Sequence, residues 1–406
     1  MHTALTLAIV ALLSQAALPA TIVVPDDYTT IQGAINAALN GDTILVRPGT
    51  YMETIDFIGK AVTVRSEWGP YVTTIDANKG DNCVRFTNGE QQDSILKGFE
   101  LTNARGYTQD GGAIYCYRAS PTISSNRIIG NEADYGGGMH LYDNSHAVVV
   151  NNIIAGNIAG AGGAISCSDS NPTVTNNTIV GNDAGHYAGG VYCYRSSPQI
   201  TNTIVWNNTA PLGPQIYDGS PVVTYCDVMG GWTGAGNFNS DPQFVTAPPF
   251  NKDYHITLAS PCRDSGSNGA PSLPGHDFEG DPRPAAGGID IGADEFATHL
   301  YSLGTPSPGV LISLRIANGT TAVPVTLLRS NGLQDPPQPT PYGDLYLSWP
   351  LATMSLGAVP SSGVLVYDIT IPAGIVPGTI VFIQALVGNL GSPGTVLSNA
   401  AILTIQ

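Results

Sequence analysis

The pattern of apolar and polar residues predicts short strands along residues 21–296. Runs such as DTILV, AVTVR, AIYCY, PTIS and RII are β-branched or alternating, and Gly, Asn, Ser and Pro separate them. Such runs between turn residues are typical of β-strands. TTIQGAINAAL at residues 29–39 differs, because its apolar residues, Ala38 and Leu39 included, fall on one face of a helix. Asp27 or Thr29 is the expected N-cap of this helix. We therefore expect an all-β fold with one N-terminal capping helix.

The strand pattern repeats every 25 or 26 residues between residues 111 and 210. The repeat is marked by two columns of residues: Gly112, Gly137, Gly163 and Gly189, and Asn131, Asn157, Asn182 and Asn207. Each unit holds three strand runs, and it lacks the spacing of a leucine-rich repeat. The sequence therefore predicts a parallel β-helix with three strands per coil, in which each coil buries its inward face against its neighbours. Stacked Asn side chains hydrogen-bond along such a rod, so we expect the Asn column to be structural.

The repeat contains a phrase that is nearly the same at residues 111–123, GGAIYCYRASPTI, and at residues 188–200, AGGVYCYRSSPQI. Alternation along the strand in this repeated phrase separates inward from outward positions. Two uniformly apolar columns are expected in the core: Ile114, Met139, Ile165 and Val191, and Cys116, Leu141, Cys167 and Cys193. Cysteine stands where one copy has leucine, which indicates buried thiols. Cys226 and Cys262 lie outside the repeat, and for this pair a disulfide and two free thiols are equally compatible with the sequence.

The outward positions are rich in aromatic residues. Together with the loops that enter the same strand, they supply the candidate ligand-binding residues Tyr115, Tyr117, Tyr135, His140, Tyr142, His186, Tyr187, Tyr192 and Tyr194. An aromatic ring packs on a sugar ring while its polar tip and nearby charged groups bond the sugar hydroxyls. This pattern favours an elongated polysaccharide-binding surface. Cross-strand stacking that only stabilises the sheet is the alternative.

The charge and the first residues restrict partners and location. The chain carries 31 acidic and 15 basic residues, a net charge of −16, so nucleic acid is not an expected partner. Residues 1–20 contain a short apolar run followed by small residues, which is typical of a secretory signal peptide; a buried first strand is the alternative. No later run is long enough for a membrane span. We expect a secreted or cell-surface protein.

Carboxylates and arginines beside the aromatic columns are candidate catalytic residues. They are Asp134, Asp143, Asp169, Asp183, Arg118 and Arg195. Two opposed carboxylates can act as acid and base in glycoside hydrolysis, whereas Asp residues also occur in turns for backbone reasons. Further along, a group of acidic residues suits calcium or caps turns: Asp277, Asp281, Asp290, Asp294 and Glu295. We expect no cofactor, with calcium as the open alternative.

The last residues differ in composition from the repeat. Residues 297–308 read as a linker, and residues 309–406 contain apolar strand runs divided by Pro and Gly, with few charges. This pattern predicts a small β-sandwich. An anchoring module that attaches the protein to a cell surface and a domain that packs on the rod both fit.

Residues 21–296 resemble the right-handed parallel β-helix proteins of the pectate-lyase-like superfamily. The resemblance rests on VPDDYTTIQGAINAALNGDTILVRPGTY and on the GG-x-I/V-Y-C and SPTI-x-x-N coils. GNFNSDPQFV, SPCRDSGSN and DFEGDPRPAAGGIDIGADEF are similar to the closing region of bacterial secreted β-helix proteins of the choice-of-anchor type. The resemblance implies the fold and a bacterial surface protein. The local signatures of polygalacturonases, pectin methylesterases and pectate lyases are missing from the sequence.

Three functions remain open on this basis. The first is an exported β-helix that binds extracellular polysaccharide along the tyrosine-rich face. The second is a glycoside hydrolase or polysaccharide lyase that acts at the same face. The third is a structural surface protein without a ligand.

Overall fold

The computed structural model describes residues 18–106, 111–244, 254–257, 259–281, 283–284 and 287–296, and the strands between residues 299 and 404. Most of the expected signal peptide therefore lies outside the described residues. So do Tyr107 and Asp110, which precede the first Gly-Gly-x-Ile-Tyr-Cys segment in the sequence.

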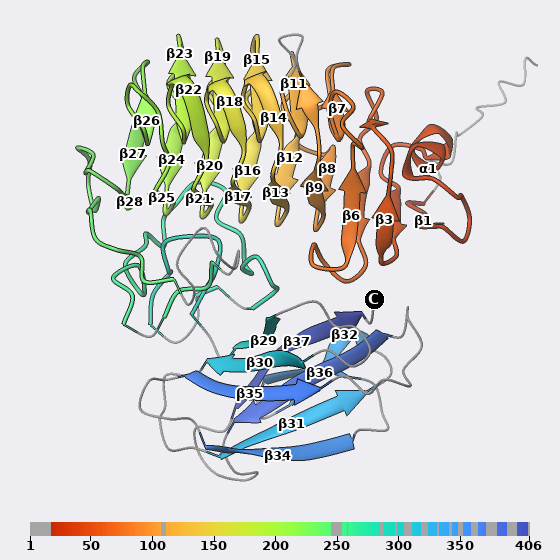
Figure 1. The fold of residues 1–406 in the computed structure, drawn as a ribbon. Helices are drawn as coiled ribbons and strands as arrows, with labels where there is room; N and C mark the ends of the chain where they lie inside the picture. Colours follow the sequence, from red (N-terminus) through yellow and green to blue (C-terminus); the bar gives the residue numbers. More distant parts are fainter. Residues whose placement is uncertain are drawn as a thin grey trace, which may run out of the picture.

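Three long parallel sheets form a rod (Figure 1). The first has nine strands: β1 (Thr21–Val24), β2 (Thr43–Val46), β5 (Thr63–Ser66), β8 (Ile95–Lys97), β12 (Thr122–Ser124), β16 (Val148–Val150), β20 (Thr173–Thr175), β24 (Gln199–Thr201) and β27 (Val222–Thr224). The second has seven: β4 (Ile55–Asp56), β7 (Val84–Phe86), β11 (Ile114–Tyr117), β15 (Met139–Tyr142), β19 (Ile165–Ser168), β23 (Val191–Tyr194) and β26 (Ile216–Tyr217).

The third sheet has eight strands: β3 (Gly49–Tyr51), β6 (Thr73–Asp76), β9 (Glu100–Thr102), β13 (Arg127–Ile129), β17 (Ile153–Ala155), β21 (Thr178–Val180), β25 (Ile204–Trp206) and β28 (Asp227–Val228). From β2 to β26, each coil thus contributes one strand to each sheet, as the repeat predicts. The middle coils carry a fourth short strand that the sequence did not predict: β10 (Arg105–Gly106), β14 (Glu132–Tyr135), β18 (Ile158–Ala161) and β22 (Asp183–Tyr187).

The predicted inward columns form the core of the rod. Ile114, Met139, Ile165 and Val191 pair in register along the second sheet, and so do Cys116, Leu141, Cys167 and Cys193. All eight side chains are fully buried. Burial raises the pKa of Cys193 to about 12 and that of Cys116 and Cys167 well above the ordinary value, so these thiols stay protonated and behave as small apolar groups.

The Cys226–Cys262 disulfide, one of the two alternatives for this pair, does not form. Both residues are free, buried thiols. Cys226 packs in the core of the rod, whereas Cys262 packs in a second apolar cluster with Phe244, Tyr254 and Phe278. The Cys262 thiol instead donates a hydrogen bond to Asp227 Oδ2, 3.4 Å away.

The asparagine column is a hydrogen-bonded ladder, and its last member differs from the prediction. The Nδ2 atoms of Asn131, Asn157 and Asn182 donate to the Oδ1 of the next asparagine at 2.9–3.0 Å, and the ladder continues to Asn208, not to Asn207. Asn207 is exposed and has a φ of 53°, in the turn position that Gly130, Gly156 and Gly181 occupy in the preceding coils. Asn and Gly are the residues that tolerate this left-handed conformation, and this explains the shift by one residue.

The predicted helix, α1 (Ile31–Ala37), packs against β1, β2 and β4 of the first coil. Its N-cap is Thr30, one residue after the prediction, and the Thr30 hydroxyl accepts from the Gly33 N–H. Glu53 accepts the N–H groups of the first turn at 2.9 and 3.0 Å, and Lys60 Nζ donates to three carbonyls at the other end at 2.8 Å. Both charges complement the helix dipole. Leu39, expected on the buried stripe, is 60% exposed because the helix ends before it.

The C-terminal strands are antiparallel. They are β29 (His299–Leu303), β30 (Leu311–Ala317), β31 (Pro324–Ser330), β32 (Leu333–Thr340), β33 (Gly343–Leu347), β34 (Ala352–Ala358), β35 (Val364–Thr370), β36 (Ile380–Val387) and β37 (Val396–Thr404). They form sheets of the order β29-β30-β35, β34-β31-β36-β37 and β32-β33. β29 lies within the predicted linker.

Candidate functional site

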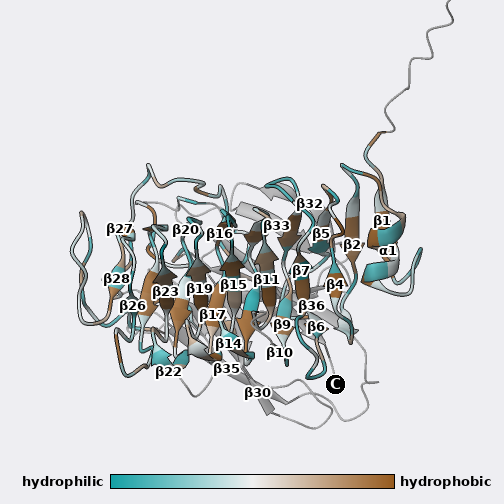
Figure 2. Cartoon of the chain, turned by 90° about the horizontal axis from the view of Figure 1, so that it is seen from above, coloured by the Kyte–Doolittle hydropathy of each residue, from teal (hydrophilic) through white to brown (hydrophobic). Residues whose placement is uncertain are grey.

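The predicted outward columns form one aromatic face along the rod. Tyr115, His140, Ser166, Tyr192 and Tyr217 pair in register, and beside them so do Tyr117, Tyr142, Ser168 and Tyr194. A third column from the short fourth strands contains Tyr135, Ala161 and Tyr187. Figure 2 shows the strands β11, β15, β19 and β23 that carry the first two columns side by side along the rod. We call the aromatic residues of these columns, with His186, the tyrosine face.

His140 lies at the centre of a first aromatic cluster. Its ring centroid is 5.9 Å from that of Tyr115, 5.7 Å from that of Tyr135 and 5.5 Å from that of Tyr142. Tyr117 joins the cluster through Tyr142, at 5.7 Å. His140 is only 4% exposed, whereas Tyr135 and Tyr142 are exposed. His140 therefore positions the tyrosines around it, and the tyrosines are the residues that a ligand meets first.

A second aromatic cluster lies two coils further along. Tyr187 stacks on Tyr192 and on Tyr217 with centroids 5.8 and 5.3 Å apart and rings nearly parallel, at 13° and 11°. Tyr194 and His186 extend it. The sequence analysis missed Tyr217, because the last coil is shorter and lacks the repeated phrase. Burial raises the pKa of Tyr192, and the charge of Asp218 and the neighbouring phenols add to this effect.

One coil between the clusters has small residues in all three columns. They are Ala161, Ser166 and Ser168, which we call the small-residue coil. Ser168 is mostly buried, and its Oγ lies 3.4 Å from His140 Nε2. Ser166 is fully buried, and its Oγ has no hydrogen-bond partner. The tyrosine face is therefore divided into two aromatic clusters with polar hydroxyls between them.

Four of the candidate catalytic residues form ion pairs along one turn column. Arg118 Nε lies 2.6 Å from Asp143 Oδ2, and Arg195 Nε lies 3.1 Å from Asp169 Oδ1. All four adopt φ near 51°, so the same turn geometry directs their side chains along the rod. Adjacent coils place the two aspartates about 4.8 Å apart in the backbone. A retaining glycosidase uses two such carboxyls directly on the substrate, whereas here each is engaged by an arginine.

The other two candidate catalytic residues lie on the opposite side of the aromatic columns. Asp134 is exposed on β14, next to Tyr135. Asp183 is exposed on β22 and accepts a hydrogen bond from the Thr209 hydroxyl. The structure therefore does not bring the six candidates into one site.

The acidic residues of the closing segment brace turns. Asp277 Oδ1 accepts the N–H groups of three residues at 2.8–2.9 Å, and its Oδ2 accepts that of Glu295. Asp290 accepts two further backbone N–H groups, and burial raises its pKa to about 6. Glu295 Oε2 lies 3.5 Å from Arg283 Nε. In the part of the chain that the structure describes, no three His, Cys, Asp or Glu side chains gather as a metal site.

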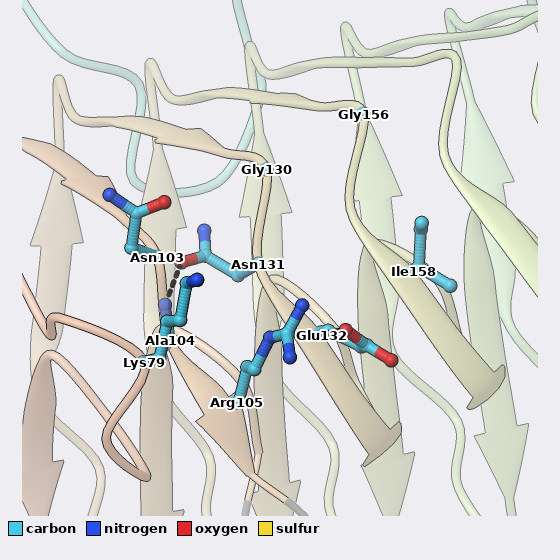
Figure 3. A pocket seen from close by; sticks show the side chains of 9 residues that line it. All are labelled: Lys79, Asn103, Ala104, Arg105, Gly130, Asn131, Glu132, Gly156 and Ile158. Carbon is cyan, nitrogen blue, oxygen red and sulfur yellow. Dashed lines mark hydrogen bonds and ion pairs between the residues drawn. The ribbon is translucent and has the colours of Figure 1, made fainter.

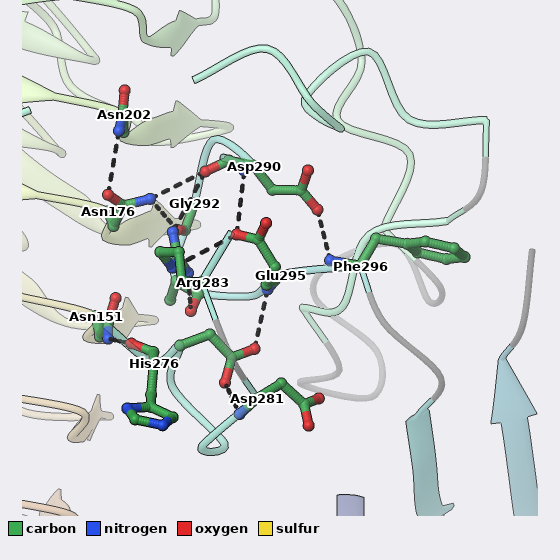
Figure 4. A network of polar contacts seen from close by, with 12 residues as sticks. Asn151, Asn176, Asn202, His276, Asp281, Arg283, Asp290, Gly292, Glu295 and Phe296 are labelled. Carbon is green, nitrogen blue, oxygen red and sulfur yellow. Dashed lines mark hydrogen bonds and ion pairs between the residues drawn. The ribbon is translucent and has the colours of Figure 1, made fainter. Parts of the chain in front are cut away.

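The closing segment packs on the rod through a second asparagine column, at turn positions. Asn151 Nδ2 donates to His276 O at 2.7 Å, and Asn176 Nδ2 donates to Asp290 O and Gly292 O at 2.9 and 3.2 Å (Figure 4). Asn202 Nδ2 donates to Ser267 O at 3.0 Å. The acidic group, for which the sequence left calcium binding and turn capping open, lies in this segment that covers the rod.

A small pocket opens at the turns beside the sheet formed by the short strands β10, β14, β18 and β22. It is lined by Lys79, Asn103, Ala104, Arg105, Gly130, Asn131, Glu132, Gly156 and Ile158 (Figure 3). Arg105 Nε lies 3.4 Å from Glu132 Oε2, so the charge of this arginine is largely balanced. Lys79 adds a second cation to the wall. The pocket suits a small polar or anionic group, and the sequence analysis did not identify it.

The comparison with protein families agrees with this geometry. Residues 68–228 match the family model described as right handed beta helix region. The match and the parallel sheets show a right-handed parallel β-helix protein, and the predicted fold of the rod is confirmed. Searches of curated proteins and of solved structures found no match to the chain. Among the described residues, no helix has the length and apolar character of a membrane span.

Proposed function

We propose that the protein binds an extracellular polysaccharide along the tyrosine face. The observation that carries the proposal is the register of outward aromatic residues, which occupy four of five adjacent coils in the first column, at a spacing of about 4.8 Å per coil. A polysaccharide also repeats along one direction, so several of its sugar units can meet aromatic contacts along the rod. Tyrosine supplies an apolar ring and a hydroxyl, both of which a sugar can use.

The charges around the face support a neutral ligand. Arg118 and Arg195, the cations of the adjacent turn column, are paired with Asp143 and Asp169. The chain as a whole has a net charge of −16, which repels a polyanion. We therefore expect neutral chains to bind more tightly than uronate-rich or sulfated ones.

A panel of soluble neutral and acidic polysaccharides tests this function by isothermal titration calorimetry and by reducing-end release. Binding of a neutral chain without release of products is the expected result. Release of products would favour the glycoside hydrolase or lyase, and loss of that release in Asp143→Asn or Asp169→Asn would place the reaction at the ion-paired column. Absence of binding across the panel would favour the structural protein.

The parts outside the face fit an exported, surface-attached protein. We propose that residues 1–20 direct secretion, that α1 closes the first coil of the rod, and that residues 309–406 form a β-sandwich that anchors the rod to a bacterial surface. The antiparallel C-terminal sheets and the choice-of-anchor resemblance of the closing segment support the last step. Fractionation of bacterial cells that express the full chain, compared with a chain ending at Phe296, tests it. Surface association only of the full chain is expected.

A further inference from the structure

The turn column that precedes the short fourth strands changes its residue type along the rod. Asn103 and Asn207 occupy the turn at the two ends of the column, and the coils between them have Gly130, Gly156 and Gly181 at this position. All five residues adopt a φ between 53° and 70°, which both Asn and Gly tolerate. The backbone therefore does not require glycine here, and the glycines leave the surface of the middle coils without side chains.

The pocket in Figure 3 lies over two of these glycine turns. Gly130 and Gly156 line it, and a Cβ atom on Gly156 would have no other atom within 4 Å. The volume of the pocket is about 220 Å³. Pockets for drug-sized ligands have about 300–1,000 Å³, so this one has room for a smaller molecule of a few carbon atoms.

Two cations and one carboxylate line the pocket: Lys79, Arg105 and Glu132. Arg105 and Glu132 are joined by a single contact, Nε to Oε2 at 3.4 Å, so the terminal N–H groups of the guanidinium are available to a ligand. Among the described residues, the Lys79 side chain has no ion pair or hydrogen bond. Two cations and one carboxylate leave the lining a formal charge of +1 on a chain of net charge −16, and this local excess favours a monoanion.

Ile158 gives the pocket an apolar wall. Its side chain is 50% exposed, and it pairs in register with Glu132 in one neighbouring coil and with Asp183 in the other. An exposed isoleucine in a column of charged residues can cover the carbon atoms of a ligand whose charged end meets the cations. A carboxylate suits that end, because its oxygens accept charge-assisted hydrogen bonds from both an ammonium and a guanidinium group.

We propose that this pocket binds a small aliphatic monocarboxylate. The carboxylate lies between Lys79 and Arg105, and the carbon chain contacts Ile158. A phosphate dianion exceeds the charge of the lining, and a neutral molecule leaves the excess cation without an anion. None of the lining residues belongs to the tyrosine face, so the inference does not depend on the proposed polysaccharide binding.

Titration of the full chain with propionate, followed by NMR of the backbone amides, tests the site. The Gly130 and Gly156 amide signals should shift and reach saturation. Propionamide has nearly the same shape without the charge, so it should cause little shift, and inorganic phosphate should bind more weakly than propionate. No saturable shift with propionate, an equal response to propionamide, or tighter binding of phosphate would overturn the proposal.

Two matched pairs of variants, followed at the Gly130 amide, place the ligand. Gly156→Asn adds a side chain to the pocket at a turn where the same column already has asparagine, and Gly181→Asn makes this change one coil further, outside the lining. Only Gly156→Asn should weaken propionate binding, by roughly tenfold or more. Lys79→Met should weaken it roughly fivefold or more, whereas Lys79→Arg should retain it.

The amide spectrum identifies the folded variants. Equal affinity of the two asparagine variants, or of the two Lys79 variants, overturns the site. If Gly156→Asn does not fold, the comparison of Lys79→Met with Lys79→Arg gives the answer alone.

Discussion

Replacement of Asn208 by alanine tests whether the asparagine ladder stabilises the rod. Asn208 Oδ1 accepts from Asn182 N and Asn182 Nδ2 at 3.0 and 2.9 Å. Its Nδ2 donates to Ile179 O at 3.1 Å and to Gln215 Oε1 at 2.8 Å. Alanine removes all four hydrogen bonds in a buried position. At about 1 kcal/mol for each lost bond, we expect the free energy of unfolding to fall by about 4 kcal/mol.

The neighbouring residue supplies the matched control. Asn207 is exposed, and its side chain makes no hydrogen bond to the residues that the structure describes. Because its φ is 53°, glycine is the substitution that its backbone accepts without strain. Asn207→Gly should therefore change the free energy of unfolding by less than about 1 kcal/mol.

Urea unfolding followed by circular dichroism compares the two variants, and hydrogen exchange gives the local result. The Asn182 amide, which donates to Asn208, should exchange at least tenfold faster in Asn208→Ala than in Asn207→Gly. Equal destabilisation by the two substitutions, or a larger effect of Asn207→Gly, would refute the ladder as the structure places it.

Three further changes test the helix, the core and the closing segment. Lys60→Met removes three hydrogen bonds to the end of α1 and should destabilise the protein by about 2–3 kcal/mol in urea unfolding, against little change in Lys79→Met. Cys167→Tyr should strongly lower the melting temperature, because the inward column has no room for a ring, and a stable variant would contradict the inward assignment. Burial raises the pKa of Asp227 to about 7. Because the folded state then binds this proton more tightly than the unfolded state, stability should fall as the pH rises from about 4 to about 7, by up to about 1.4 kcal/mol per pH unit for this group. Asp227→Asn should remove that part of the slope, and an unchanged slope would contradict the raised pKa.

The sequence predicts the columns of the rod because a strand alternates its side chains with a strict period of two. Ile114 and Cys116 therefore follow from the repeated phrase, and so does the outward position of Tyr115. The prediction fails where the backbone leaves the strand. The left-handed turn moves the ladder from Asn207 to Asn208, and the shorter last coil hides Tyr217.

The chemistry of the candidate site depends on contacts that no spacing in the sequence reveals. Arg118 and Asp143 are 25 residues apart, and only the turn geometry shows that they pair. The acidic residues around Asp277 resemble a calcium site in composition, but backbone N–H groups take up several of their oxygens. The buried, unpaired hydroxyl of Ser166 is likewise a property of its surroundings and not of its residue type.

The affinity of a double tyrosine variant for a neutral polysaccharide tests the central claim most directly. Tyr142 and Tyr194 are 40% and 45% exposed on the tyrosine face, and Tyr28 and Tyr225, outside it, are 41% and 36% exposed. We expect Tyr142→Ala with Tyr194→Ala to weaken binding by about 1–3 kcal/mol, roughly fivefold or more, without loss of folding. Tyr28→Ala with Tyr225→Ala should bind as the unchanged protein does. Equal affinity of the two double variants, measured by calorimetry on the same polysaccharide, would contradict binding at this face.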